Sequence, residues 1–199
     1  MSTLALRRPR KGAYHHRELR SAILRAAAEL LAEQGVAALS LREAARRAGV
    51  SHNAPYRHFA DRDALLAALA SEGFRQLGEA LEAAGGPRAR GEAYVRFALD
   101  HPQRFRLMFG GRLRIAAHPA LRDAAARTYD GLLRAFEPLA GPRGAPTAAA
   151  AAWALAHGLA QLLLDGHFAH ALRSEADAAA FAREVLGAVR FARAAPPAG

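Results

Sequence analysis

The sequence predicts an all-α protein, in which an N-terminal three-helix helix-turn-helix domain is joined by a long helix to a larger helical domain. Composition is the first observation: of 199 residues, 53 are Ala, whereas Val, Ile and Thr together number only 10. Ala is the best helix former and β-branched residues favour strands, so a substantial sheet is not expected. The second observation is that apolar residues recur at helical spacing between Gly and Pro breakers.

The positive charge of the chain, a net +10, is concentrated near its N-terminus. Residues 1–62 hold 12 basic and 5 acidic side chains, a net of +7, whereas residues 63–199 hold 16 and 13, a net of +3. Arg accounts for 27 of the 28 basic residues, and its guanidinium suits phosphates and guanine edges. A GC-rich genome explains the excess of Arg over Lys equally well. The location of the charge, however, favours polyanion binding by the first third of the chain.

Several classes of function are not expected. The chain has no Cys, which excludes disulfides, thiolate zinc sites and a cysteine nucleophile. The Gly-x-Ser-x-Gly, P-loop and His-Glu-x-x-His motifs are absent, so an enzyme is not expected. His157, His167 and His170 have only Asp165 as a nearby carboxylate, so neither a metal site nor a cofactor is expected.

Two segments bear on localisation. The N-terminus has no apolar segment of the secretory type. Residues 144–164 carry no formal charge, but their apolarity is mostly Ala and they include Pro146, so we expect a buried helix of a soluble protein and not a membrane span. A cytoplasmic protein is the expectation.

The helix-turn-helix domain is expected over residues 14–62, after a flexible basic arm over residues 1–13. A helix over residues 16–34 ends at Gly35, and Ser40 with Glu43 forms a capping box that begins a helix reaching residue 48. Gly49 makes a turn, Ser51 caps a third helix to about residue 58, and Asp61 caps a long helix to about residue 84.

The third helix of this domain is too polar to lie in a core. Its outward surface carries six hydrogen-bonding side chains, namely Ser51, His52, Asn53, Tyr56, Arg57 and His58. Hydroxyl and basic groups suit phosphate oxygens, and Asn suits the edge of adenine. Phe59 is expected in the core. Tyr56 as a core aromatic and His58 as a plain exposed helix end are the competing interpretations.

The remaining residues, 63–194, are expected to form a second helical domain, followed by a disordered tail over residues 195–199. Helices are expected over residues 91–100, 102–109, 119–139, 147–170 and 175–194, separated by Gly and Pro breakers such as the segment 141–146. The aromatic and apolar side chains of this domain are numerous enough either to line a cavity or to fill a core.

Specific motifs in both halves resemble one family. Ser40-Leu-Arg-Glu-Ala-Ala-Arg-Arg-Ala-Gly-Val-Ser51, Tyr56-Arg-His-Phe59 and Asp61-Arg-Asp-Ala-Leu65 resemble the DNA-binding domain of TetR/AcrR-type regulators over residues 16–70. His101-Pro102, Arg106-Leu-Met-Phe-Gly110 and Trp153-Ala-Leu-Ala-His-Gly158 are similar to the ligand-binding domain named for its Trp-His-Gly motif.

The resemblance implies a sequence-specific transcriptional regulator of TetR type, a repressor that a small-molecule ligand releases from a palindromic operator. By resemblance, Ser51, Tyr56, His58 and Arg62 contact phosphates, and His52 and Asn53 read bases. Ser40 and Arg42 place the start of the second helix near a phosphate. Pro55 departs from the family pattern. It removes the first hydrogen bond of the third helix, so that the first turn is expected to be either tightened or shifted. A non-specific architectural DNA-binding protein is the alternative.

The resemblance also implies a ligand pocket and a homodimer. The pocket candidates are Phe105, Met108, Phe109, Trp153 and His157. A core position for each residue, and a structural hydrogen bond for His157, are the competing interpretations. The helices over residues 147–170 and 175–194 are expected to form a four-helix dimer bundle, and the long helix over residues 62–84 is expected to be the hinge between pocket and DNA-reading helix.

Overall fold

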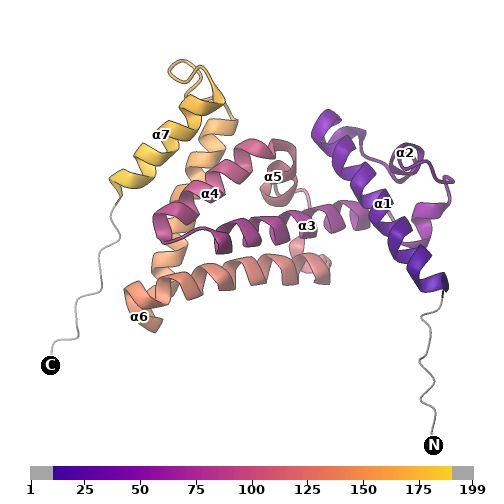
Figure 1. Ribbon diagram of the computed structural model, residues 1–199, viewed down its shortest axis with the longest axis horizontal. Helices are drawn as coiled ribbons and strands as arrows, with labels where there is room; N and C mark the ends of the chain where they lie inside the picture. Colours follow the sequence, from indigo (N-terminus) through magenta and orange to yellow (C-terminus); the bar gives the residue numbers. More distant parts are fainter. Residues whose placement is uncertain (1–10, 190–199) are drawn as a thin grey trace, which may run out of the picture. The chain divides into compact units, whose positions relative to one another are not determined.

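The computed structural model describes residues 11–189, and within them it has seven α-helices, three short 3₁₀ helices and no strand (Figure 1). The all-α prediction is therefore confirmed. The elements in chain order are α1 (Lys11–Gln34), η1 (Val36–Ala38), α2 (Leu41–Arg47), η2 (Ala54–Arg57), α3 (Arg62–Ala83), α4 (Pro87–Asp100), α5 (Pro102–Phe109), η3 (Ile115–Ala117), α6 (Pro119–Leu164) and α7 (Glu175–Ala188).

The chain divides into two compact units, Met1–Leu69 and Ala70–Gly199. The boundary falls inside α3, so this helix contributes its first two turns to the first unit and its remainder to the second. Residues 1–10 of the expected basic arm and the expected tail lie outside the described residues.

Helix α1 begins at Lys11, five residues before the predicted start. Its buried face carries Ile23, Ala27, Leu30 and Leu31, which pack in the core of the first unit. The helix ends as predicted at Gly35, whose positive φ of 74° suits glycine and whose amide donates to the carbonyl of Leu31 at 3.0 Å.

The predicted cap of α2 is confirmed in one of its two parts. Ser40 Oγ accepts a hydrogen bond from the Glu43 amide at 3.1 Å. The Glu43 side chain does not complete the capping box, because its carboxylate pairs with Arg46 at 2.5 Å. At the other end, the Gly49 amide donates to Arg46 and the Val50 amide to Ala45, which is the Schellman arrangement that ends a helix at a glycine of positive φ.

The third helix of the first unit is not the two-turn helix that the sequence predicted. It is the 3₁₀ helix η2, which begins at Ala54 and not after a Ser51 cap. Pro55 has no amide to donate to the Ser51 carbonyl, so the Ala54 amide donates to that carbonyl instead, at 2.9 Å. Of the two outcomes expected from Pro55, the structure has the tightened first turn, and the predicted length of the helix is corrected.

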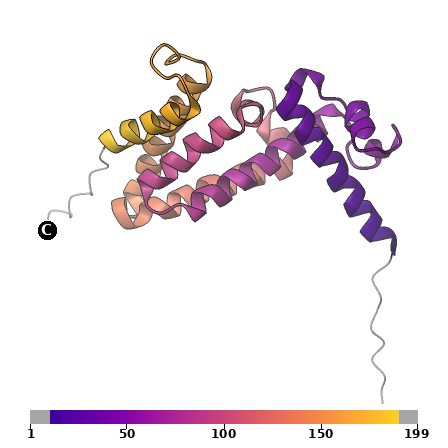
Figure 2. The ribbon, with the colours of Figure 1, turned by 45° about the horizontal axis from the view of Figure 1, so that its top comes forward.

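In the second unit, α4 packs against α6 and α7, and the first half of α6 runs beside α3 (Figures 1 and 2). Small residues allow close approach at two crossings. A Cβ on Gly73 would lie 2.5 Å from Met108 Sδ, and a Cβ on Gly91 would lie 3.2 Å from Leu186 Cδ2. Leu186 therefore belongs to the core between α4 and α7.

Helix α6 is two helices joined at Gly141, where φ is 67° and ψ is 169°. The break lies in the predicted 141–146 segment. The second half ends at Leu164, six residues before the predicted end. The Gly166 amide donates to Leu163 and the His167 amide to Leu162 there, a Schellman ending that the sequence analysis did not predict.

Helix α6 is the one described helix that is long and apolar enough to cross a membrane by length and composition alone, with a mean hydropathy of 1.4. Only 22% of that apolar window is buried, so the prediction of a buried helix over residues 144–164 is wrong for the single chain. Trp153 is 38% and Leu162 42% exposed.

Candidate functional site

The first unit presents a polar surface around η2. Ser51, His52, Asn53, Tyr56 and Arg57 are all exposed, with Tyr56 at 51%. Tyr56 is therefore not a core residue. The segment is short, and its exposed groups lie within seven consecutive residues, so a bound polymer would contact several of them together.

Two buried residues hold this segment in place. Pro55 is buried and Phe59 is 2% exposed, and the amides of His58 and Phe59 both donate to the Pro55 carbonyl at 2.9 Å. The guanidinium of Arg20 in α1 lies 5.3 Å from the centre of the Phe59 ring. His58 is half-buried beside Phe59, with ring centres 6.5 Å apart. The buried Pro55 ring thus anchors η2, while the following residues Tyr56 and Arg57 stay exposed.

Arg62 has a structural role that the sequence analysis missed. Its Nε donates to the Leu39 carbonyl at 2.6 Å, and its Nη2 donates to the Val36 carbonyl. These bonds tie the start of α3 to the loop before α2. Ser40 and Arg42, which the sequence predicted to lie near a phosphate, follow that loop at the start of α2. Ser40 is half-buried as the helix cap, and Arg42 is exposed.

The cations of this unit differ in how far they are neutralised. Arg46 pairs with Glu43, and Arg47 pairs with Glu33 at 2.7 Å, where its guanidinium lowers the pKa of the Glu33 carboxyl. Arg42 and Arg57 form no ion pair within residues 18–189. Their charge remains available to an anionic partner.

The second unit contains an apolar, partly open cavity of about 150 Å³. Its walls come from α3, α4, α6 and α7, with Phe109 at the end of α5. An engineered cavity of this volume holds a benzene ring. Two of the five predicted pocket residues, Phe109 and Trp153, line it.

Phe105, Met108 and His157 do not line this cavity, although Phe105 and His157 pack against the lining residue Phe109. Phe105 is fully buried, with its ring centre 4.8 Å from that of Phe109 and 5.4 Å from that of His157. Met108 packs against Gly73 of α3. Phe105 and Met108 are thus buried core residues in this structure.

A chain of hydrogen bonds joins three aromatic residues at the cavity wall. Trp153 Nε1 donates to the Tyr94 hydroxyl oxygen at 3.1 Å, and that hydroxyl lies 2.9 Å from His157 Nδ1. Indole N–H is only a donor, so the Tyr94 oxygen accepts from Trp153, and the same hydroxyl is hydrogen-bonded to Nδ1 of His157. The structural hydrogen bond of His157 thus goes to a side chain and not to backbone.

Burial shifts the pKa of both titratable groups in this hydrogen-bond chain, Tyr94 and His157. It raises the pKa of the Tyr94 hydroxyl and lowers the pKa of the His157 imidazole, because the charged form loses hydration in each case. Both shifts favour the neutral hydrogen-bonded state.

The sequence analysis missed several residues that line the cavity, namely Phe74, Tyr94, Thr128 and Tyr129. The Thr128 hydroxyl lies 3.0 Å from both the Phe74 and the Ala124 carbonyl oxygens. Tyr94 lies at the centre of the hydrogen-bond chain, but the sequence analysis predicted only that its segment is helical. Within residues 18–189, no group of three His, Asp or Glu side chains could hold a metal ion.

The comparisons with known proteins agree with both units. Residues 23–69 match the family model of bacterial regulatory proteins of the tetR family, and residues 87–196 match the model of the tetracyclin repressor-like C-terminal domain. The chain belongs to the TetR family. It is a sequence-specific DNA-binding transcriptional regulator, in a family of regulators and not of enzymes.

Solved structures show the same relationship. A protein of unknown function from Rhodococcus sp. RHA1 is 36% identical, with 88% of this chain and 97% of that chain covered and a TM-score of 0.69. A transcriptional regulator from the same organism is 25% identical, with 85% and 94% covered and a TM-score of 0.62. A multidrug binding protein, EbrR, solved with imidazole, is 27% identical, with 98% and 100% covered and a TM-score of 0.58.

Proposed function

We propose that this regulator is a cytoplasmic homodimer that reads a palindromic operator through the η2 segment and is released from it by a small molecule bound in the cavity. The single observation that carries the proposal is that one chain holds both an exposed polar segment and an apolar cavity, each in its own compact unit.

On the DNA side, we assign phosphate contacts to Ser51, Tyr56, Arg57 and His58, and base contacts to His52 and Asn53. The exposure of all but the half-buried His58, and the uncompensated charge of Arg57, support this assignment. Ser40 and Arg42 are proposed to meet the backbone at the start of α2. Arg62 is proposed to act chiefly by holding the loop before α2, because two of its donors are already used.

The dimer interface is proposed on the second half of α6 and on α7. Leu162 in the second half of α6 is 42% exposed and Val189 directly after α7 is 43% exposed, and these apolar side chains support the assignment. A two-fold axis would place two reading segments about 34 Å apart, or a multiple of this distance, to match two half-sites.

Release would follow if the ligand binds better to the conformation that does not fit the operator. Helix α3 supplies the covalent connection, since it begins in the first unit and its residues Phe74, Leu77 and Leu81 line the cavity. EbrR is named as a multidrug binding protein, and this similarity supports a small-molecule ligand for the present regulator.

A matched pair of Ala variants tests the ligand step. Ala125 lines the cavity and the neighbouring Ala126 is exposed. Small apolar compounds that raise the Tm of the full chain are titrated into its complex with operator DNA. We expect such compounds to release the DNA, Ala125→Leu to abolish both effects with DNA affinity unchanged, and Ala126→Leu to behave as wild type. Compounds that bind without releasing DNA would overturn the proposal.

A further inference from the structure

We propose that the ligand is a small apolar carboxylate, held through its acid group by Arg90 at the N-terminal end of α4. This inference rests on the proposed function only in taking the cavity to be the ligand site. It adds the chemical class of the ligand and the residue that selects it.

The charge of the cavity lining is the first argument. The residues that line it include two cations, Arg88 and Arg90, and among these described residues there is no Asp or Glu. The other lining residues are almost all apolar or aromatic, including Phe74, Phe109 and Phe136. A ligand that fits such a site has an apolar body and a negative end, because a lining with cations and no carboxylate repels a cationic ligand.

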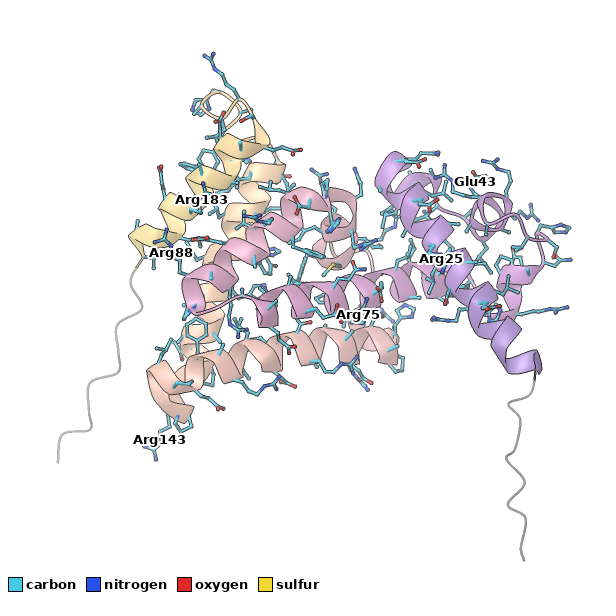
Figure 3. The ribbon with its side chains drawn as sticks, in the orientation of Figure 1. Arg25, Glu43, Arg75, Arg88, Arg143 and Arg183 are labelled. Atoms are coloured by element: carbon cyan, nitrogen blue, oxygen red, sulfur yellow. The ribbon has the colours of Figure 1, made fainter. Side chains whose placement is uncertain are left out.

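The two arginines are not equivalent. The Arg88 guanidinium pairs with Glu92 at 2.9 Å and donates to the Arg183 carbonyl at 3.3 Å, between α4 and α7 (Figure 3). Arg90 is half-buried, and its guanidinium makes no hydrogen bond or ion pair with the side chains or backbone of residues 18–189. Arg90 is therefore the cation that has a full set of donors left for a carboxylate.

The start of α4 adds to the same preference. Pro87 opens the helix and has no amide, and the first backbone bond of the helix is from the Arg90 amide to the Gly86 carbonyl at 3.2 Å. The amides of Arg88 and Ala89 thus lie in the first turn, where intrahelical acceptors are lacking and the helix dipole favours an anion. Pro87 and Gly91 of this turn also line the cavity.

The remaining polar groups of the wall set the size and shape of the apolar body. The Tyr94 hydroxyl and the Trp153 indole N–H bond to one another, and Thr128 bonds to backbone. These three groups offer a ligand no spare donor, whereas the hydroxyl of Tyr129, which also lines the cavity, makes no hydrogen bond within the described residues. A cavity of about 150 Å³ holds roughly one aromatic ring, so an aryl carboxylate matches both the volume and the charge.

Three probes with one carbon skeleton test the chemical class. Phenylacetate, phenylacetamide and 2-phenylethylamine are titrated into the full chain without DNA, by calorimetry at pH 7. We expect the acid to bind about tenfold more tightly than the amide, the effect of one charge-assisted bond, and the amine to bind more weakly than the amide.

Variants at one position assign the effect to Arg90. Arg90→Gln is expected to reduce the affinity for phenylacetate to that for the amide and to leave amide binding unchanged, while Arg90→Lys keeps part of the preference. Arg96→Gln, on the same helix but outside the cavity lining, is the control and is expected to behave as wild type.

The proposal is overturned if the amide or the amine binds as tightly as the acid, if no probe binds, or if Arg90→Gln weakens acid and amide equally. These readouts contain no DNA. An acid that binds through Arg90 but does not release the operator would therefore contradict the proposed function and leave this inference intact.

Discussion

The Tyr94 hydroxyl lies 2.9 Å from Nδ1 of His157, across 63 positions of the sequence, and it connects α4 to the second half of α6. The same oxygen accepts from Trp153 Nε1. One phenol thus satisfies the indole and the imidazole of the Trp-His-Gly segment, and it does so in the wall of the cavity.

Tyr94→Phe is expected to lower the free energy of unfolding by about 1–3 kcal/mol, because the two polar partners of the hydroxyl lose their hydrogen bonds in a half-buried site. Urea unfolding measures the change. Tyr129→Phe is the matched control: Tyr129 also lines the cavity, but its hydroxyl makes no hydrogen bond within the described residues. Equal effects of the two variants would contradict the role given to Tyr94.

The stability of the protein is expected to fall as the pH is lowered from 7.5 to 5.5. Burial lowers the pKa of His157 and, with Arg104 nearby, that of His101. Between the folded and the unfolded pKa the unfolded chain binds more protons, so stability is full above about pH 6.5 and is lost as the pH falls through the folded pKa. Urea unfolding at both pH values checks the sign, and replacing both residues with Gln should flatten the dependence. A rise in stability on acidification would refute the expectation.

Arg62→Met, which keeps much of the length of the side chain and removes its donors, is expected to destabilise the first unit by about 1–3 kcal/mol. The bonds to the Leu39 and Val36 carbonyls are the reason. Arg42→Met is the control, since Arg42 is exposed and has no ion pair within the described residues. Thermal unfolding of both variants decides between a structural role for Arg62 and a role in DNA contact alone.

Pro55→Ala is expected to alter sequence preference more than stability. It restores an amide that can donate to the Ser51 carbonyl, which favours an α-helical first turn and rotates His52 and Asn53. Selection of bound sequences from a random DNA pool, with wild type and variant in parallel, measures the effect. Identical selected sequences would show that the 3₁₀ geometry of η2 does not affect base reading.

Local signals in the sequence predicted the fold because they act over a few residues. Three of these signals are the Ser40 cap, the Gly35 stop and the Asp61 cap of α3. In the last of these, Asp61 Oδ1 accepts from the Ala64 amide at 2.7 Å. Each signal depends on backbone groups within four positions. Pro55 predicted a tightened or shifted turn at its own position for the same reason. Gly166 is a local signal of the same kind, but the sequence analysis did not predict that α6 ends there.

The cavity was harder to predict, because its residues meet only through tertiary packing. Phe105 and Phe109 are four positions apart on α5, and sequence spacing alone gives no reason why one lines the cavity and the other lies behind it. Tyr94 shares no local pattern with Trp153 or His157. Arg90 differs from Arg88 because Arg88 is exposed, paired with Glu92 and bonded to a backbone carbonyl of α7, whereas Arg90 is half-buried without such partners within the described residues.

The most direct test of this account compares two DNA duplexes of equal length and composition, one from the region flanking the regulator's own gene and one shuffled. Fluorescence anisotropy at fixed salt gives both affinities. We expect the flanking duplex to bind at least about a thousandfold more tightly, Asn53→Ala to reduce that ratio, and Tyr56→Ala to weaken both duplexes alike. Equal affinity for the two duplexes, unchanged by these substitutions, would contradict the assignment of the η2 segment as the reader of a specific operator.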